Sequence, residues 1–351
     1  MRIAIDCRKL ADFGIGTYLK GLLRGLARTR ADHEFILLGS RADIEALSLD
    51  SRFLPVQLEV GHYSLRELTA VPRVAAKHRA ELLHNPHYVT PFDSIPMVTT
   101  VHDLIHLHQR MANPLAPLYA KWMIGRALTK SHWIATVSET VRNEIVAWHP
   151  EVAQRISVTP NGVDQSFFLR RSADEIAEMK SSLGVTSYFL FVGNDKPHKN
   201  LHGLIRAFNL VSDLDGIDLV VAGPGPESAG PARIKRPGFV SDEELIRLYQ
   251  GAVAVVVPSL EEGFGLTALE AMASGVPVIT SNAAALVELT GDAAIHVDAE
   301  NATALAESLK AIASDGELRH MLSNRGTARA RAFSWDRCAA LTLDIYDRAA
   351  S

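Results

Sequence analysis

The chain has 351 residues, of which 47% are hydrophobic and 22% are charged. These proportions exclude a disordered chain or a fibre, and the length predicts about two domains of ~150 residues each. No apolar run approaches the ~18 residues that a membrane span needs, and the two cysteines, Cys7 and Cys338, are too few for a disulfide framework or a zinc cluster. We therefore expect a cytoplasmic protein with reduced thiols.

The net charge of −4 is unevenly distributed, because residues 1–168 carry +3 and the remainder carries −7. A basic first half suits contact with anionic partners, although chance explains so small an imbalance equally well. The first apolar run ends at the charged residue Asp6, so the start of the chain predicts a strand and not a secretory signal.

Short apolar runs alternate with amphipathic stretches along the first half of the chain. Helices are expected at residues 18–28 and 118–129. Strands are expected at residues 3–5, 35–38, 56–60, 82–84, 97–101, 133–136 and 156–158. Near-continuous apolar strands between helices are typical of a parallel sheet that is covered on both faces.

The same alternation restarts in the second half. Strands are expected at residues 188–192, 219–222, 252–257, 278–280 and 295–297. The turn sequence Pro160-Asn161-Gly162 and the polar stretch 170–180 separate the two halves. We predict an α/β protein with two doubly wound, Rossmann-like domains at 1–165 and 166–332, followed by a helical segment at 333–351. Sheets of this kind bind ligands beyond the carboxyl ends of their strands.

The most informative segment runs from Val257 to Pro277. A buried strand ends, the loop Gly263-Phe264-Gly265 follows, and a helix begins near Leu266. A glycine loop between a strand and a helix N-terminus is typical of an anion site, because free amides and the helix dipole meet there. Glu262 precedes the helix and Glu270 lies about one turn inside it. Ionised carboxylates accept hydrogen bonds from sugar hydroxyls, so these two predict sugars on either side of a bound phosphate.

This segment resembles the E-x7-E motif of retaining GT-B glycosyltransferases, in particular family GT4. The resemblance implies that Glu262 contacts the donor sugar and Glu270 the nucleotide ribose. It also implies that the residues between them line the donor site. These residues are Gly263, Phe264, Gly265, Leu266 and Thr267.

A second segment, Gly193-Asn194-Asp-Lys196-Pro-His-Lys199, follows the first strand of the second half. It resembles the loop of the same family that places a lysine on the donor diphosphate, and Lys199 matches that lysine. The family often has an arginine at the position of Asn194. Lys196 could partly replace that charge. The alternative interpretation, for Lys196 and for Lys199 alike, is an ordinary solvated lysine in a loop.

The pair His102-Asp103 follows the predicted strand at 97–101. It resembles the GT4 His-Asp pair beside the transferred sugar, which implies that His102 hydrogen-bonds that sugar. The nearby histidines are a poor basis for a metal site, because no acid or cysteine set accompanies them. They are His84, His87, His106 and His108.

The loop Gly14-Ile-Gly16 lies between the first strand and the first helix, and it lacks the third glycine of a dinucleotide fingerprint. The resemblance implies that it faces the donor diphosphate and the acceptor; an ordinary turn is the alternative. Phe239 and Val240 precede a capping box and are expected to flank the nucleotide base. Asp213-Leu-Asp215 matches D-x-D, the metal-binding motif of GT-A glycosyltransferases. Because it lies between a predicted helix and a predicted strand, we interpret it as a turn.

Taken together, the resemblance implies a retaining transferase that moves a hexose from a nucleotide-diphosphate sugar to a saccharide or lipid-linked saccharide, in the synthesis of a surface polysaccharide such as lipopolysaccharide. The residues around His102 look like those of bacterial mannosyltransferases, which favours GDP-mannose over UDP-hexoses. No metal or other cofactor is expected, since Lys199 and the helix N-terminus would carry the charge. The alternatives are a nucleotide-sugar epimerase, a non-catalytic nucleotide-sugar-binding protein and, third, an NAD oxidoreductase.

No nucleic-acid partner is expected. Two stretches of the first half, 63–79 and 121–130, combine basic and aromatic residues. They are candidates for peripheral contact with the inner face of the cell membrane, and a helix that simply faces the core is the competing interpretation. The segment 333–351 resembles the last GT-B helix, which implies that it crosses back to the first domain.

Overall fold

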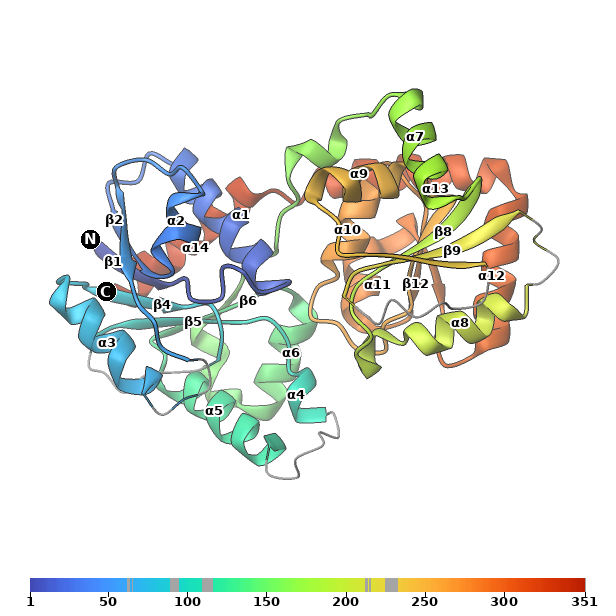
Figure 1. Ribbon diagram of the computed structural model, residues 1–351. Coiled ribbons are helices and arrows are strands. Elements are labelled where there is room, and N and C mark those ends of the chain that lie inside the picture. The colour runs from blue at the N-terminus through green and yellow to red at the C-terminus, as the bar shows by residue number, and fades with distance from the viewer. Residues whose placement is uncertain are drawn as a thin grey trace. The chain divides into compact units, whose positions relative to one another are not determined.

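The computed structural model describes residues 1–61, 64, 66–88, 95–108, 116–211, 214, 216–224 and 233–350. The chain divides into two compact units, Met1–Gly162 with Phe333–Ser351, and Val163–Ala332 (Figure 1). The first unit's main segment ends at Gly162, close to the domain boundary that the sequence predicts at residue 165. Asp213 and Asp215 lie outside the described residues, as does Tyr63 at the start of the first predicted membrane stretch.

The first unit contains a parallel sheet in which the described strands have the order β3-β2-β1-β4-β5-β6-β7. The strands are β1 (Arg2–Asp6), β2 (Glu34–Gly39), β3 (Phe53–Gln57), β4 (Leu82–Asn85), β5 (Met97–Val101), β6 (Trp133–Thr136) and β7 (Ile156–Val158). The strand order reverses between β1 and β4, so the loops after β1 and β4 leave the same edge of the sheet at a switch point where doubly wound folds bind ligands.

Helices cover both faces of this sheet (Figure 1). They are α1 (Ile15–Arg28), α2 (Arg41–Glu45), α3 (Glu67–Lys77), α4 (Ile105–His108), α5 (Ala116–Lys130), α6 (Glu139–Trp148) and α14 (Trp335–Ala350). The last helix packs on the first helix of the same unit. A Cβ atom added to Gly21 would lie 2.1 Å from the ring of Trp335, so glycines on α1 make the room that this indole occupies.

The second unit contains a parallel sheet with the order β10-β9-β8-β11-β12-β13 in its described residues. The strands are β8 (Ser187–Val192), β9 (Ile217–Ala222), β10 (Ile234–Gly238), β11 (Ala254–Val257), β12 (Val278–Ser281) and β13 (Ile295–Val297). The helices are α7 (Ala173–Leu183), α8 (Leu201–Asn209), α9 (Asp242–Gly251), α10 (Leu266–Ala273), α11 (Ala284–Thr290), α12 (Ala302–Ser314) and α13 (Gly316–Ala330).

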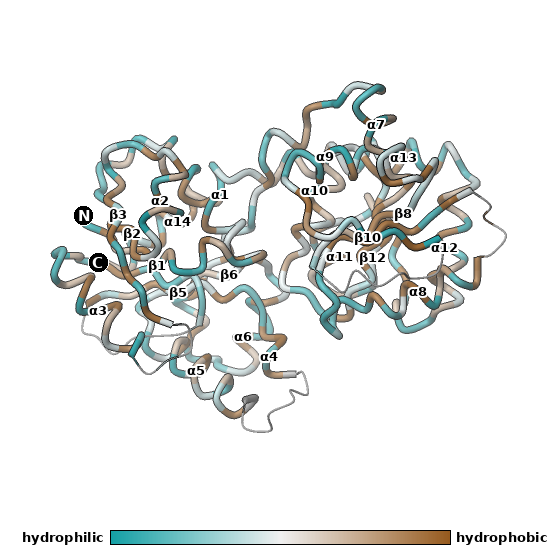
Figure 2. The backbone as a smooth tube through the Cα atoms, in the orientation of Figure 1, coloured by the Kyte–Doolittle hydropathy of each residue, from teal (hydrophilic) through white to brown (hydrophobic). Residues whose placement is uncertain are grey.

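Each core lies between its sheet and the covering helices. Phe189 and Leu219 on the strands and Phe208 on α8 belong to one fully buried cluster of the second unit. Full burial of one such side chain stabilises the fold by roughly 1.5–3 kcal/mol. The apolar colour that follows the central strands in Figure 2 therefore marks the main source of stability in both units.

Three elements differ from the sequence prediction. The strand β10 was not predicted, because it is an edge strand with Lys235, Arg236 and Pro237 in place of an apolar run. The stretch expected as a polar linker is instead the helix α7, which begins at a capping box between Ser172 and Glu175 and buries no residue fully. The strand expected at 56–60 begins earlier, at Phe53.

Candidate functional site

The loops after β8 and β11 lie together, because these two strands are neighbours and parallel. The loop after β8 contains the short 3-10 helix η3 (Pro197–Lys199), and the loop after β11 leads into α10. The backbone N–H of Leu260 donates to the carbonyl oxygen of His198 at 2.7 Å, which ties one loop to the other. Residues 62 positions apart in sequence thus belong to one loop cluster at the carboxyl edge of the second sheet.

Lys199 and Glu262 meet within this cluster. The Nζ of Lys199 donates to Oε1 of Glu262 at 2.6 Å, and the hydroxyl of Ser259 donates to the same oxygen at 2.8 Å. Both charged side chains are partly buried, which strengthens their attraction relative to an exposed pair. The structure therefore brings together the two residues that the sequence assigned to the diphosphate and the donor sugar, and adds Ser259, which sequence reasoning missed.

The N-terminus of α10 borders the same loop. Gly265 precedes this helix with a φ of 104°, and a Cβ atom there would lie 2.5 Å from Leu286. Glycine is required for both reasons. No side chain caps the helix, so the amides that start at Leu266 and Thr267 are available to an anion. Gly263 and Phe264 are buried beside it.

Glu270 lies on α10 and is held by a partner from α9. The buried hydroxyl of Tyr249 donates to Oε2 of Glu270 at 2.9 Å. Burial raises the pKa of Glu270 to about 7, although the hydrogen bond from Tyr249 acts in the opposite direction. Glu270 therefore exchanges its proton near neutral pH, unlike an exposed glutamate. Tyr249 was not anticipated, because nothing in the sequence links it to Glu270.

The remaining predicted residues of the second unit have less defined surroundings. The Oδ1 of Asn194 is buried and makes no hydrogen bond within the described part of the chain. Lys196 is exposed. Phe239 follows β10 and is 76% exposed, and Val240 beside it is half-buried. The contact of these residues with a nucleotide base stays a prediction.

In the first unit, His102 follows β5 and packs against the ring of Tyr18, with 4.7 Å between the ring centroids. Its Nε2 lies 2.9 Å from the carbonyl oxygen of Pro86. Burial lowers the pKa of His102 to about 4, although Asp103 and the Pro86 carbonyl favour the charged form. The side chain of Asp103 accepts a hydrogen bond from the amide of Ile105 at 3.1 Å and so stabilises the turn into α4.

The two glycines of the first loop have structural reasons of their own. Gly14 precedes α1 with a φ of 65°, which favours glycine. A Cβ atom on Gly16 would lie 2.6 Å from the carbonyl oxygen of Leu10. The close approach that excludes a side chain at Gly16 is therefore made to the backbone of the chain itself. Contact of this loop with a diphosphate stays a prediction.

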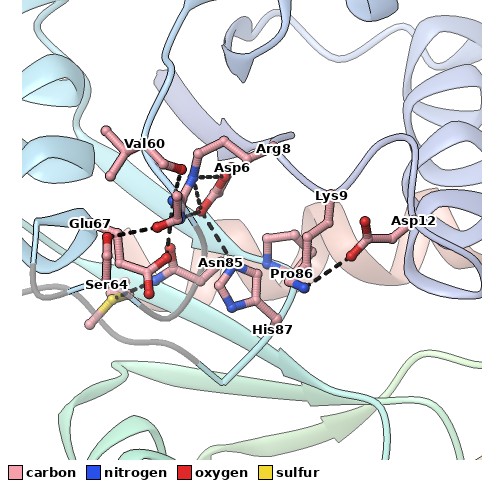
Figure 3. A network of polar contacts seen from close by, with 12 residues as sticks. Asp6, Arg8, Lys9, Asp12, Val60, Ser64, Glu67, Asn85, Pro86 and His87 are labelled. Carbon is pink, nitrogen blue, oxygen red and sulfur yellow. Dashed lines mark hydrogen bonds and ion pairs between the residues drawn. The ribbon is translucent and has the colours of Figure 1, made fainter.

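A buried polar cluster, which sequence reasoning missed, lies at the carboxyl edge of β1 and β4. It consists of Asp6, Arg8, Glu67 and His87, and we call it the Asp6 cluster (Figure 3). Arg8 donates to Asp6 at 2.6 Å and to Glu67 at 3.0 Å, and Nε2 of His87 lies 3.4 Å from Asp6. Asp6 and Arg8, charged residues that directly follow the first apolar run, were the sequence signal that could have indicated this cluster.

The buried ring of His84 has a structural role in the first unit. His84 is fully buried and bonds through its two ring nitrogens to Tyr346 and Thr100, at 2.7 and 2.8 Å. Over the residues that the structure describes, no group of three His, Cys, Asp or Glu side chains is placed to hold a metal ion. His84 thus attaches α14 to the sheet.

Two family models match consecutive parts of the chain. Residues 14–167 match the model described as Glycosyltransferase Family 4, and residues 174–329 match the model described as Glycosyl transferases group 1. The chain belongs to the group 1 glycosyltransferases. The E-x7-E block, the Lys199 loop and the α10 N-terminus all lie inside the second matched region.

Full-length relatives support this assignment. The glycosyltransferase is 29% identical to O-antigen chain mannosyltransferase B of Escherichia coli over an alignment of 363 positions, which covers 95% of each chain. The sucrose-phosphate synthase of Thermosynechococcus elongatus has a similar structure, with 21% identity and a TM-score of 0.79 over 99% of this chain and 98% of that one. Anabaena HepE in complex with UDP-glucose gives 17% identity and a TM-score of 0.80 over 99% of both chains. The fold is GT-B, as predicted.

No helix among the described residues has both the length and the apolar character that crossing a bilayer requires.

Proposed function

We propose that this glycosyltransferase moves a hexose from a nucleotide-diphosphate sugar to a saccharide or a lipid-linked saccharide, with retention of configuration at the anomeric carbon. The observation that carries the proposal is the contact of Lys199 with Glu262 beside the uncapped start of α10. A cation and free amides suit a diphosphate, while the carboxylates of Glu262 and Glu270 suit the hydroxyls of the two flanking sugars.

Mannose, carried by GDP, is the proposed donor sugar. The supporting relative is the Escherichia coli mannosyltransferase, which aligns with nearly the whole chain. UDP-glucose is the competing donor, because the structurally similar HepE was solved with that ligand. The Escherichia coli mannosyltransferase also supports a surface polysaccharide, of the O-antigen type found in lipopolysaccharide, as the proposed product.

The transfer breaks the bond between the anomeric carbon and the β-phosphate oxygen, and the electron pair stays on the diphosphate. The positive charge of Lys199 and the amides at the start of α10 stabilise the charge that develops there. The acceptor oxygen bonds to the same face of the anomeric carbon, and its proton passes to the leaving diphosphate. Since these groups of the chain itself stabilise the leaving group, we propose that no metal or other cofactor takes part.

The outer face of α5 is the proposed contact with a membrane that carries a lipid-linked acceptor. Leu118 and Trp122 are 66% and 52% exposed there, and Lys121 and Lys130 of the same helix are also exposed. The opposite side of the helix is buried, so the core does not account for these exposed residues. Apolar side chains flanked by lysines suit the interface of an anionic bilayer.

The function is tested with ligands first and turnover second. GDP, UDP, GDP-mannose and UDP-glucose are compared by thermal shift, because a ligand at 100 times its dissociation constant adds about 2.7 kcal/mol to the unfolding free energy. We expect GDP and GDP-mannose to stabilise the protein most. Stabilisation by UDP compounds alone would replace the proposed donor, and stabilisation by none would contradict the function.

Lys199→Ala is expected to lower turnover at least 100-fold while the protein stays folded, because the leaving group loses its cation. Turnover is followed as nucleoside diphosphate released on addition of a mannosyl acceptor. Lys310→Ala removes the same charge from α12 in the same unit and should keep full activity. Wild-type turnover in Lys199→Ala would contradict the assignment, and release of an epimerised sugar nucleotide without an acceptor would indicate an epimerase.

A further inference from the structure

The orientation of the His102 ring follows from its contact with Pro86. A carbonyl oxygen only accepts hydrogen bonds, so Nε2 of His102 carries the hydrogen that points to it at 2.9 Å. The ring is neutral at pH 7 because its pKa lies near 4. A neutral imidazole protonated at Nε2 has a lone pair at Nδ1. His102 therefore presents an acceptor, which suits a hydroxyl group of a sugar.

Pro86 is itself fixed by its neighbour in the chain. It follows β4, it is buried, and the next residue is His87, which belongs to the Asp6 cluster. In Figure 3 the ring of His87 lies beneath the carboxylate of Asp6, next to Pro86. The two side chains approach to 3.4 Å, and both are almost completely buried. The segment that carries the Pro86 carbonyl is thus tied to the end of β1.

Arg8 holds the other end of this connection. Its Nε and Nη2 donate to the two oxygens of Asp6 at 2.9 and 2.6 Å, and its Nη1 donates to Glu67 on α3. Burial favours the neutral form of Asp6, yet the contacts with His87 and Arg8 outweigh it and hold the pKa well below the ordinary value. Asp6 therefore remains a carboxylate with a fixed orientation.

Such a cluster is unfavourable unless every charge keeps its partner. Removing one partner of a buried ion pair leaves the other uncompensated, whereas apolar replacements of the whole group are often neutral for stability. Stability alone thus gives no reason for four buried polar side chains at this edge. The strands β1, β4 and β5 are adjacent, so the cluster lies one strand away from His102.

We propose that Asp6 and His87 are positioning residues, which fix the Pro86 carbonyl and through it hold His102 as the tautomer with hydrogen on Nε2. His102 then accepts a hydrogen bond at Nδ1 from a hydroxyl of the reacting sugars. The second step rests on the proposed function. The first step concerns the free protein and does not depend on it.

The test is the nitrogen-15 NMR spectrum of protein labelled in its histidines, recorded without substrate. We expect His102 to appear as a single Nε2–H tautomer between pH 6 and 8, with its signals assigned by their loss in His102→Gln. In His87→Leu, which removes the contact with Asp6, His102 should become a mixture of tautomers. His87→Gln keeps an N–H group for Asp6 and should restore the wild-type spectrum. His320→Leu, at an exposed site on α13, is the matched control.

Kinetics provide the second measurement. His87→Leu should lower kcat by about tenfold and leave the dissociation constant of GDP unchanged, because the diphosphate site lies in the other unit. A folded His87→Leu variant that keeps the wild-type tautomer of His102 would overturn the proposal. If His87→Leu does not fold, the spectrum of Asp6→Asn decides in the same way. If His87→Leu changes the tautomer of His102 but the wild-type protein turns over no nucleotide sugar, the proposed function is rejected. The positioning role of Asp6 and His87 is then still supported.

Discussion

At the scale of single residues, the proton on Glu270 has the most direct consequence for binding. Burial raises its pKa to about 7 in the free protein. A protonated acid gives a ribose diol a weaker acceptor than a carboxylate does. In the proposed donor site, binding therefore requires the loss of this proton below pH 7, and it requires no such step above pH 8.

We therefore predict that the dissociation constant of GDP rises by up to tenfold for each pH unit below 7 and is constant above 8. Calorimetric titration between pH 5.5 and 8.5 measures it. The phosphates of GDP titrate in the same range, so Glu270→Gln is the control that retains their contribution alone. Equal pH profiles for the two proteins would contradict the prediction.

The residues show where sequence reasoning succeeds and where it stops. The block from Glu262 to Glu270 was predictable, because an apolar strand, two glycines and a helix start follow one another locally. The bond between Lys199 and Glu262 joins residues 63 positions apart, and only the pairing of β8 with β11 creates it. The Asp6 cluster was missed for the same reason, since α3 and the end of β4 supply two of its members.

At the scale of elements, the packing of α1 against α14 depends on Gly21, whose missing side chain leaves room for the ring of Trp335. Gly21→Ala places a methyl group 2.1 Å from the ring atoms of Trp335. We expect a loss of roughly 1–3 kcal/mol in the unfolding free energy, because a packed interface does not yield space without strain. Urea denaturation measures the change.

Gly125→Ala is the matched substitution in α5. Its added Cβ atom would come no closer than 3.6 Å to a neighbour, which is an ordinary contact. This variant should gain roughly 0.5–1 kcal/mol from the lower helix propensity of glycine. Equal effects of the two substitutions would show that the Trp335 contact has no special role.

The outer face of α5 gives a second prediction at this scale. Vesicles with anionic lipids should sediment the wild-type protein, and a variant with Leu118→Ser and Trp122→Ser should stay largely in the supernatant. The exposed Leu210 of the other unit allows Leu210→Ser as a control. Added salt should weaken sedimentation, since the lysines contribute through screened charge. Sedimentation that is independent of lipid would exclude this surface.

The elements that the sequence did not predict share one property. Neither β10 nor α7 has a long, fully buried apolar run: β10 contains Lys235 and Arg236, and the large apolar residues of α7 are only partly buried. The strands at the centre of each sheet were predicted almost to the residue, because burial on both faces requires continuous apolar runs.

At the scale of the whole molecule, the two ends of the chain complete one unit. The helix α14 belongs with Met1–Gly162, and the hydroxyl of Tyr346 bonds to the buried ring of His84 at 2.7 Å. A chain that ends at Ala332 should therefore lose hydrogen-exchange protection in β1, β4 and β5 and keep it in β8 and β11. Equal protection in both units of the shortened chain would contradict this prediction.

The ion pair of Lys199 with Glu262 also has a consequence for the selectivity of the proposed donor site. In the free protein the ammonium group of Lys199 has a negative partner at 2.6 Å, which offsets its charge. Inorganic phosphate would have to separate the two groups and would leave the glutamate without compensation. An activated sugar offers the glutamate a hydroxyl at the same moment as it offers the lysine an oxyanion. We therefore expect this one contact to favour the proposed donor over small inorganic anions.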